Sequence, residues 1–123
     1  MESFDTLLRR HRARAGVSGN ALARAIGTDA SYLNRIERGE RQAPAREAVE
    51  RIADALRLTP EERDELFVSA GHLPDYLLRL GPLDPTLRLV ADVLGDELIP
   101  DDQRAAFRQI VALVAQRWRP GAR

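Results

Sequence analysis

Apolar residues in the first 71 positions recur every three or four residues, and glycine, proline and small polar residues interrupt them at short intervals. This period is typical of amphipathic helices that cover a common core with one face. Serine, threonine and aspartate stand where such helices would begin, and glycine stands where most of them would end. The pattern predicts five short helices, within residues 3–16, 18–27, 28–38, 45–56 and 59–70.

The helical period weakens after these segments and returns near the C-terminal end. Residues 72–84 mix prolines and glycine with leucines, which predicts a packed connector rather than a long helix. Two further helices are expected within residues 85–119. We therefore expect an all-α fold with a five-helix domain over residues 1–71, the connector, and a small helical C-terminal region.

Only a short turn around Gly27 separates the second and third expected helices. Two helices joined so closely cannot lie antiparallel, and they cross steeply instead, as in a helix-turn-helix motif. The third helix carries apolar residues on one side, and its other positions are Ala30, Ser31, Asn34, Arg35 and Arg38. Because arginine can bond guanine and asparagine can bond adenine in the major groove, this side is a candidate for reading DNA bases.

The formal net charge of zero conceals an uneven distribution of charge along the chain. Residues 1–46 hold nine arginines against five acidic residues, a net of +4, whereas residues 47–71 hold three against seven, a net of −4. A local basic surface matters more to a polyanionic partner than the total charge does. Arg38 and Arg41 closely follow the third helix, where the backbone of a bound duplex would run.

The composition argues against several other classes of protein. The chain has no cysteine, so it has neither disulfides nor thiolate metal sites, and its two histidines lack the spacing of metal ligands. His11, Ser18 and Asp5 make no credible catalytic triad, because Ser18 is expected to cap a helix. No apolar run approaches the roughly 20 residues that span a bilayer, and the N-terminus lacks a signal-peptide core. We expect a cytoplasmic, nucleoid-associated protein that is not an enzyme, contacts no membrane and uses no cofactor or metal.

The block SYLNRIERGER, with most of residues 4–70, resembles the Cro and phage-repressor class of helix-turn-helix regulators, the XRE family. The resemblance implies five helices, the second and third forming the DNA-reading unit and the third lying in the major groove. It implies base contacts from Ala30, Ser31, Asn34 and Arg35. It implies phosphate contacts from Arg38 and Arg41, and we expect further phosphate contacts from Ser18, Gly19, Asn20 and Tyr32. It also implies a structural ion pair between Arg12 and Glu37.

The sequence departs from the family pattern at Gly19. Many members have a glutamine there, directly after the serine that caps the second helix, and this glutamine holds a phosphate and braces the third helix. Asn20 or the exposed backbone amides of that helix start could contact the phosphate instead. The glycine therefore suggests looser or more shape-dependent reading of DNA.

The C-terminal region carries more apolar surface than the first domain needs for its own core. Apolar residues recur at helical spacing on the last expected helix, namely Phe107, Ile110, Val111, Val114 and Trp118. These residues could complete an intramolecular core or form an oligomer interface, and we expect them at the centre of a two-fold dimer. A dimer would bind an inverted repeat, because a single reading helix covers only a few base pairs.

These patterns together predict a sequence-specific transcriptional regulator that binds double-stranded DNA. We expect a homodimer that acts as a repressor by occupying an inverted-repeat operator. An alternative is the antitoxin of a toxin–antitoxin pair, which represses its own operon and neutralises a partner protein through its C-terminal region. That region could also bind a small ligand, or be cleaved by a protease, to switch the dimer off.

Overall fold

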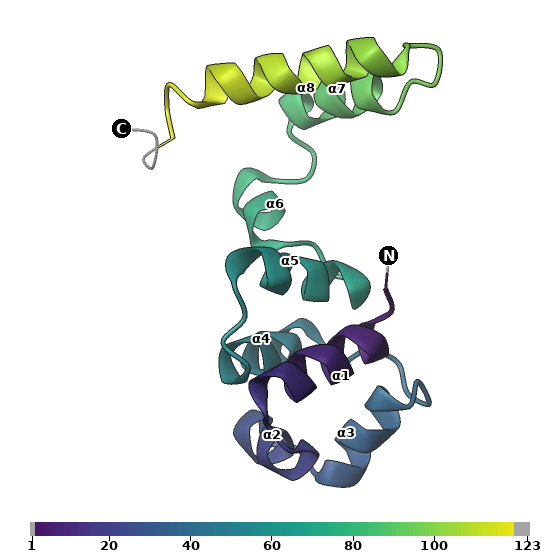
Figure 1. Ribbon diagram of the computed structural model, residues 1–123, viewed down its shortest axis with the longest axis vertical. Coiled ribbons are helices and arrows are strands. Elements are labelled where there is room, and N and C mark those ends of the chain that lie inside the picture. The colour runs from purple at the N-terminus through teal and green to yellow at the C-terminus, as the bar shows by residue number, and fades with distance from the viewer. Residues whose placement is uncertain (1, 120–123) are drawn as a thin grey trace. The chain divides into compact units, whose positions relative to one another are not determined.

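The computed structural model describes residues 2–119 and, in that range, contains eight α-helices and no β-strand (Figure 1). The helices are α1 (Phe4–Ala15), α2 (Gly19–Ile26), α3 (Ala30–Glu37), α4 (Arg46–Ala55), α5 (Pro60–Ser69), α6 (Asp75–Leu80), α7 (Pro85–Leu94) and α8 (Asp101–Ala115). The predicted all-α fold is confirmed. Across the described residues, no helix combines the length and apolarity that crossing a membrane requires. The chain forms two compact units, divided between Leu80 and Gly81.

Local capping explains why the first five helices begin and end within two residues of the predicted boundaries. At the start of α3, the carboxylate of Asp29 accepts a hydrogen bond from the backbone amide of Tyr32 at 2.7 Å. At the start of α5, Thr59 and Glu62 each accept a hydrogen bond from the other's backbone amide. α2 ends at Gly27, whose φ of 76° lies in the left-handed region that side chains disfavour.

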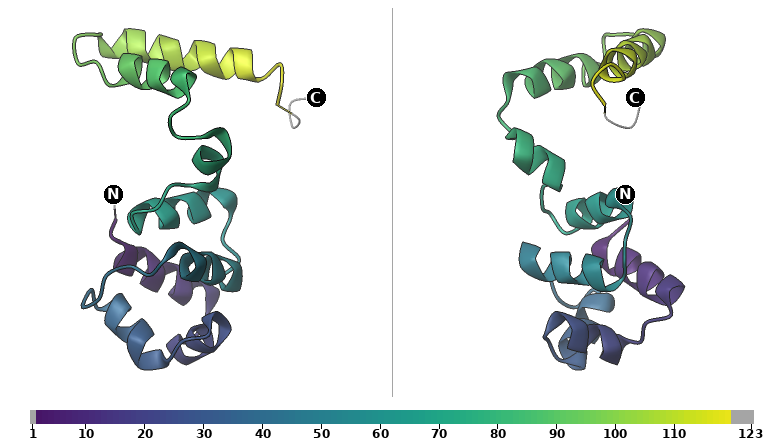
Figure 2. Two further views of the ribbon diagram at one scale, coloured as in Figure 1. Left: turned by 180° about the vertical axis from the view of Figure 1, so that it is seen from behind. Right: turned by 90° about the vertical axis from the view of Figure 1, so that its left-hand side faces the viewer.

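α1 to α5 enclose a single apolar core, and Figure 2 shows the backbone of these helices from two further sides. Every one of these helices contributes side chains that are at most 1% exposed, including Leu7, Leu22, Leu33, Ile36, Val49, Ile52, Leu66 and Phe67. α2 packs against α3 and α4, and α3 also packs against α1. The core therefore holds both helices of the predicted motif in place and leaves their other sides to solvent.

Asp75 holds α6 on the first unit. Its Oδ1 accepts a hydrogen bond from Arg46 Nη2 at 2.6 Å, and its Oδ2 accepts one from Arg63 Nε at 3.2 Å. Both guanidinium groups also stack on the buried ring of Phe67, at 4.3 and 5.1 Å from its centroid. This cluster joins α4, α5 and α6, so residues 72–80, expected as part of a connector, pack on the first unit.

The second unit contains a hairpin of α7 and α8 (Figures 1 and 2). Asp84 caps α7 by accepting a hydrogen bond from the amide of Thr86 at 2.8 Å. None of the described side chains from residue 81 onward is buried, and many apolar ones are exposed: Leu89, Leu98, Ile110, Val111, Leu113, Val114 and Trp118. The hairpin thus lacks the buried apolar surface that normally stabilises a small helical unit.

Candidate nucleic-acid interface

Three residues, Gly27 to Asp29, join α2 to α3. The amides of Gly27 and Thr28 donate to the carbonyls of Arg24 and Ala23, at 3.3 and 2.9 Å, and so close the end of α2. Asp29 then caps α3. Hydrogen bonds within the connection thus satisfy backbone groups at the end of α2 and the start of α3. The short connection therefore needs no hydrogen bonds from elsewhere in the chain.

α3 separates a buried side from an exposed one. Leu33 and Ile36 are each 1% exposed and lie in the core. The outer side carries the four predicted base-contact residues: Ser31, Asn34 and Arg35 are exposed, and Ala30 is half-buried. Asn34 and Arg35 lie three or four residues after Ser31, and Asn34 lies four after Ala30, so these positions share one side of the helix. The small residues lie at the start of α3 and the longer donors follow.

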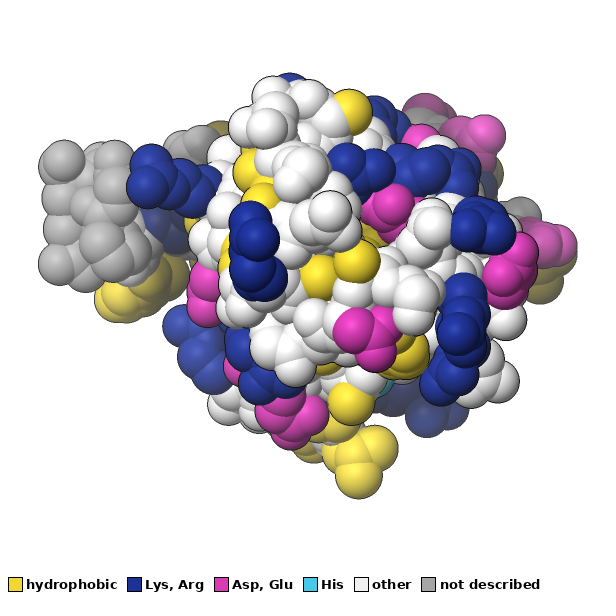
Figure 3. Space-filling view, turned by 90° about the horizontal axis from the view of Figure 1, so that it is seen from below, with side chains coloured by type: hydrophobic (Ala, Val, Ile, Leu, Met, Phe, Trp, Pro, Cys, Tyr) yellow, Lys and Arg dark blue, Asp and Glu magenta, His cyan; other side chains and the backbone are white. Residues whose placement is uncertain are grey.

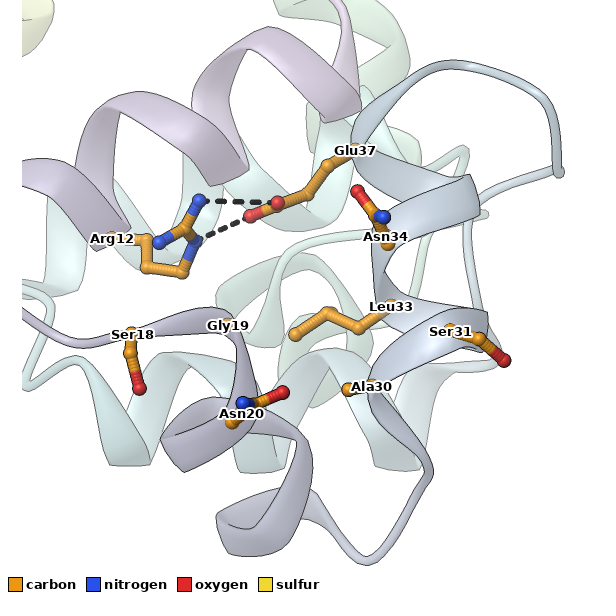
Figure 4. A pocket seen from close by; sticks show the side chains of 9 residues that line it. All are labelled: Arg12, Ser18, Gly19, Asn20, Ala30, Ser31, Leu33, Asn34 and Glu37. Carbon is orange, nitrogen blue, oxygen red and sulfur yellow. Dashed lines mark hydrogen bonds and ion pairs between the residues drawn. The ribbon is translucent and has the colours of Figure 1, made fainter.

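Arg12 of α1 and Glu37 of α3 form a two-pronged ion pair beside this surface (Figure 4). Arg12 Nε lies 2.6 Å from Glu37 Oε1, and Arg12 Nη2 lies 3.2 Å from Oε2. A third arginine nitrogen donates to the carbonyl of Val17 at 3.1 Å. Glu37 is buried, and Arg9 also donates to its backbone carbonyl. The pair ties α3 to α1 and neutralises the carboxylate that α3 contains.

A hollow of about 370 Å³ lies between the start of α2, α3 and this ion pair. Figure 4 shows the nine residues that line it: Arg12, Ser18, Gly19, Asn20, Ala30, Ser31, Leu33, Asn34 and Glu37. The Asn20 side chain extends toward Ala30, across the space between the two helices. A Cβ atom added at Gly19 would meet no atom within 4 Å. The missing side chain at this position therefore leaves space beside the base-contact residues.

Arg38 and Arg41 follow α3 and are both exposed. Arg38 lies 3.4 Å from Asn34 Oδ1 through Nε and 3.6 Å from Glu40 Oε1 through Nη1. The guanidinium of Arg41 stacks on the ring of Tyr32, 5.1 Å from its centroid. Tyr32 is partly buried against the core, so it serves as a platform for this arginine.

The exposed arginines of α1 differ from those of α2 and α3, because they have carboxylate partners within the first unit. Arg9 pairs with Asp5, Arg10 with Glu2 and Glu65, and Arg14 with Glu62. The bonds from Arg14 and from the amide of Thr59 lower the pKa of Glu62 to about 2. Carboxylates of the first unit therefore compensate most of the positive charge of α1.

Arg24 and Arg35 form no ion pair among residues 2–119, although the charge of Arg35 is near enough to help lower the pKa of Asp29. Figure 3 shows this end of the first unit, where arginine side chains surround a centre of mainly white and yellow atoms and acidic side chains lie among them. Arg24 lies one turn after Asn20 on α2, a helix without an acidic residue. Arg24 is not among the predicted contact residues. Its spacing from Asn20 and the absence of acidic residues in α2 are the sequence signals that could have identified it as a candidate.

Asp29 is a second residue that the sequence analysis did not identify as part of this surface. The sequence indicated only that it could cap α3. Its carboxylate is exposed at the start of α3 and bonds the amide of Tyr32 and the hydroxyl of Ser31. The hydrogen bond from the Tyr32 amide has the largest effect and the one from the Ser31 hydroxyl the next largest. Both lower the pKa of Asp29 below its ordinary value of 3.8. The group is therefore negatively charged at neutral pH.

The residues predicted to form a dimer interface all lie in the second unit. Phe107 is partly covered, whereas Ile110, Val111, Val114 and Trp118 are exposed. The first four belong to α8, and Trp118 follows its end. Four of these five side chains thus lie along α8, and four of the five are exposed in the described part of the chain.

Comparisons with known proteins agree with this geometry. A family model described as a helix-turn-helix domain matches residues 6–66, which include α2, α3 and most of the core. The chain is 30% identical over 90 residues to the HTH-type transcriptional repressor RghR of Bacillus subtilis (strain 168). This match covers 73% of the chain and 64% of that relative, so the chain spans less than two thirds of its length. No solved structure matches the chain significantly.

Proposed function

The chain belongs to the helix-turn-helix family through residues 6–66, and on this premise we propose that it is a transcriptional repressor that binds double-stranded DNA. The observation that carries the proposal is the outer side of α3. Arg35 projects there, exposed and without an ion pair among the described residues, next to Asn34 and Ser31. An α-helix about 10–12 Å across matches a major groove about 12 Å wide. With α3 in the groove, these side chains reach base edges.

Residues at both ends of the motif supply the phosphate contacts in this proposal. Ser18, Gly19 and Asn20 begin α2, whose free backbone amides attract an anion. Tyr32 supports Arg41, and Arg38 caps the end of α3, so both cations can contact one DNA strand past that end. Arg24 adds a contact along α2. Such contacts set the orientation of the protein on DNA, whereas base contacts set its sequence preference.

We further propose that the hairpin of α7 and α8 pairs with the same hairpin of a second copy. Ile110, Val114 and Trp118 are 60%, 56% and 69% exposed, more than a stable helical unit leaves to water. Charge supports the choice of partner: residues 84–102 hold six acids and one arginine, and residues 103–119 hold four arginines and no acid. A two-fold arrangement can place the basic segment of one copy against the acidic segment of the other. The dimer then fits an inverted repeat.

The exposed hairpin also favours a second candidate, an antitoxin whose C-terminal region binds and neutralises a partner protein. The two candidates differ in what accompanies the chain in its native host. The antitoxin co-purifies with a stoichiometric partner protein, whereas the repressor is purified as copies of this chain alone. Purification of the chain from its native host separates them.

Two substitutions in the full chain test the proposed DNA contacts. Arg35→Ala should weaken binding to a duplex selected from a random pool by about 1–3 kcal/mol, with little effect on an unrelated duplex. Arg41→Ala should weaken binding to both duplexes and reduce the salt dependence, by about 0.9 in log–log slope per subunit. Arg10→Ala is the control, because carboxylates of the first unit already compensate Arg10. If Arg35→Ala and Arg41→Ala behave alike, the assignment of base and phosphate contacts is wrong.

A further inference from the structure

Asp29 places a negative charge at the end of α3 that enters the groove in the proposed function. In a helix-turn-helix protein, the N-terminal residues of the recognition helix contact base edges. Asp29 directly precedes Ala30 and is exposed. A carboxylate so close to a polyanion is favourable only where it meets a donor, because the phosphates of the duplex repel it. The geometry of Asp29 indicates which donor that is.

Two hydrogen bonds fix one carboxylate oxygen of Asp29 and leave the other open. Oδ1 accepts from the amide of Tyr32 at 2.7 Å and from Ser31 Oγ at 2.8 Å. Oδ2 has no hydrogen-bond or ion-pair partner among residues 2–119. Because both bonds go to Oδ1, the side chain is held in one orientation and Oδ2 projects in a defined direction. The cap of α3 thus also presents a fixed acceptor.

Ser31 adds a second acceptor beside the first. Its hydroxyl proton is committed to Asp29, so its oxygen offers only lone pairs to any other group. Sequence reasoning assigned Ser31 a base contact without a direction. Because its proton is bonded to Asp29, Ser31 can only accept a hydrogen bond from DNA. At the start of α3, Asp29 and Ser31 therefore present two acceptor oxygens and no side-chain donor.

We propose that Asp29 is a specificity-determining residue that accepts a hydrogen bond from the exocyclic amino group of a cytosine in the major groove. This inference rests on the proposed DNA-binding function. In the major groove, guanine presents only acceptors, thymine an acceptor and a methyl group, and adenine an amino group next to an acceptor. Cytosine alone presents an amino donor without an acceptor on the same base, and an ionised carboxylate pairs with it. Arg35, one helical turn and a half further on, is left to read an acceptor-rich base such as guanine.

Asp29→Asn tests this role without removing the cap. Asparagine caps helices as well as aspartate does, so the bond from Tyr32 can persist, but an amide nitrogen replaces one carboxylate oxygen. In selection from random duplexes, the wild-type chain should prefer cytosine at one position of each half-site, by roughly 5- to 150-fold over the other bases. Asp29→Asn should abolish that preference or shift it toward guanine or thymine, with the other positions unchanged.

Asp84→Asn is the matched control, because Asp84 caps α7 in the second unit with the same kind of bond and carries the same charge. It should leave every base preference as in the wild type. Asp29→Ser supplies a second test, since serine keeps a cap and removes Oδ2. Melting temperatures of all variants, measured without DNA, show whether each one folds.

The outcomes separate this inference from the function on which it rests. If folded Asp29→Asn and Asp29→Ser select the same sequences as the wild type, Asp29 reads no base. If they bind all duplexes more tightly by one common factor, Asp29 acts only as a general negative charge, and the inference is again overturned. If the wild-type chain itself selects no sequence, the proposed function fails together with it.

Discussion

At the scale of single residues, the ion pair between Arg12 and Glu37 connects stability to the DNA-reading surface. Glu37 Oε1 lies 2.6 Å from Arg12 Nε, with side-chain exposures of 9% and 25%. Glu37→Ala should lower the free energy of unfolding by about 3 kcal/mol, because it leaves the arginine half-enclosed without its partner. Thermal melting without DNA measures this loss.

Glu40→Ala is the control for that prediction. Glu40 is 52% exposed and pairs with Arg38 at 3.6 Å on the surface. Because water screens such an exposed pair, the removal of Glu40 should change the free energy of unfolding by less than about 0.5 kcal/mol. Equal melting temperatures for the two variants would show that the buried pair does not stabilise α3.

The same scale shows where reasoning from the sequence had to stop. The arginines of α1 could not be sorted into DNA contacts and structural groups, because their partners are distant in the chain. Arg14, for example, meets Glu62, which is 48 residues away. Only the packing of α1 against α5 reveals that pairing. The positions on α3 were easier to sort, because helical spacing alone separates Leu33 and Ile36 from Asn34 and Arg35.

At the scale of helices, α4 is the exception, among α1 to α5, to the presence of a glycine with positive φ at the helix end. Arg57 follows the cap of α4, Leu56, with a φ of 52°, whereas glycines with positive φ follow the other four helices. Arg57→Gly should raise the free energy of unfolding by about 0.5–1 kcal/mol, since it relieves the left-handed strain at a modest cost in unfolded-state entropy. Urea unfolding measures the change.

Arg51→Gly provides the contrast, because Arg51 is exposed in the middle of α4. Glycine there should lower the free energy of unfolding by about 1 kcal/mol. A loss of stability in Arg57→Gly as well would mean that the arginine makes contacts which outweigh its backbone strain.

The start of α5 makes stability depend on acid pH. The bonds that Glu62 receives from Arg14 and Thr59 lower its pKa from 4.5 to about 2. The folded state therefore binds this proton less readily than the unfolded state, so the stabilisation is complete above about pH 4.5 and declines as the pH falls toward 2. Glu62→Gln should melt at a lower temperature at pH 7 and lose less stability than the wild type between pH 5 and 2.5.

His11 also contributes to the pH dependence of stability. Burial lowers its pKa below 6.5, so the stability linked to it begins to decline as the pH falls below 6.5. Glu62 lies 3.9 Å from His11 Nδ1, and Glu62→Gln also removes a charge that raises the pKa of His11, so wild type and variant are compared only between pH 5 and 2.5. Parallel melting-temperature curves for wild type and Glu62→Gln from pH 5 to 2.5 would contradict the role of the Glu62 carboxylate.

Most helix boundaries could be predicted because capping signals are local, as with Ser18 at α2 and Thr59 at α5. The attachment of α6 could not, since it depends on Asp75 meeting Arg46 and Arg63 from two other helices. The hollow beside Gly19 could not be predicted from the sequence either. The sequence shows that a side chain is missing at this position, but not how much space the fold leaves there.

At the scale of the whole molecule, the proposed dimer is tested by charge placed on α8. Ile110→Glu in the full chain should convert a dimer into a monomer at micromolar concentration, because a carboxylate would be buried in the apolar interface. Sedimentation equilibrium measures the mass. Gln109→Glu is the control, because Gln109 is exposed on the side of α8 opposite Phe107 and Val111, so the same charge placed there should leave the dimer intact. If both variants sediment as the wild type does, the exposed side of α8 is not the interface.

The central claim is that α3, carrying Arg35, reads duplex DNA. It is tested most directly by incubating the purified full chain with a library of fragments of its native genome, at an ionic strength of about 50 mM. The account predicts that the wild type retains a small reproducible subset of fragments and that Arg35→Ala retains DNA without that selectivity. It is contradicted if the wild-type chain, shown to be folded by circular dichroism, retains no fragment at all.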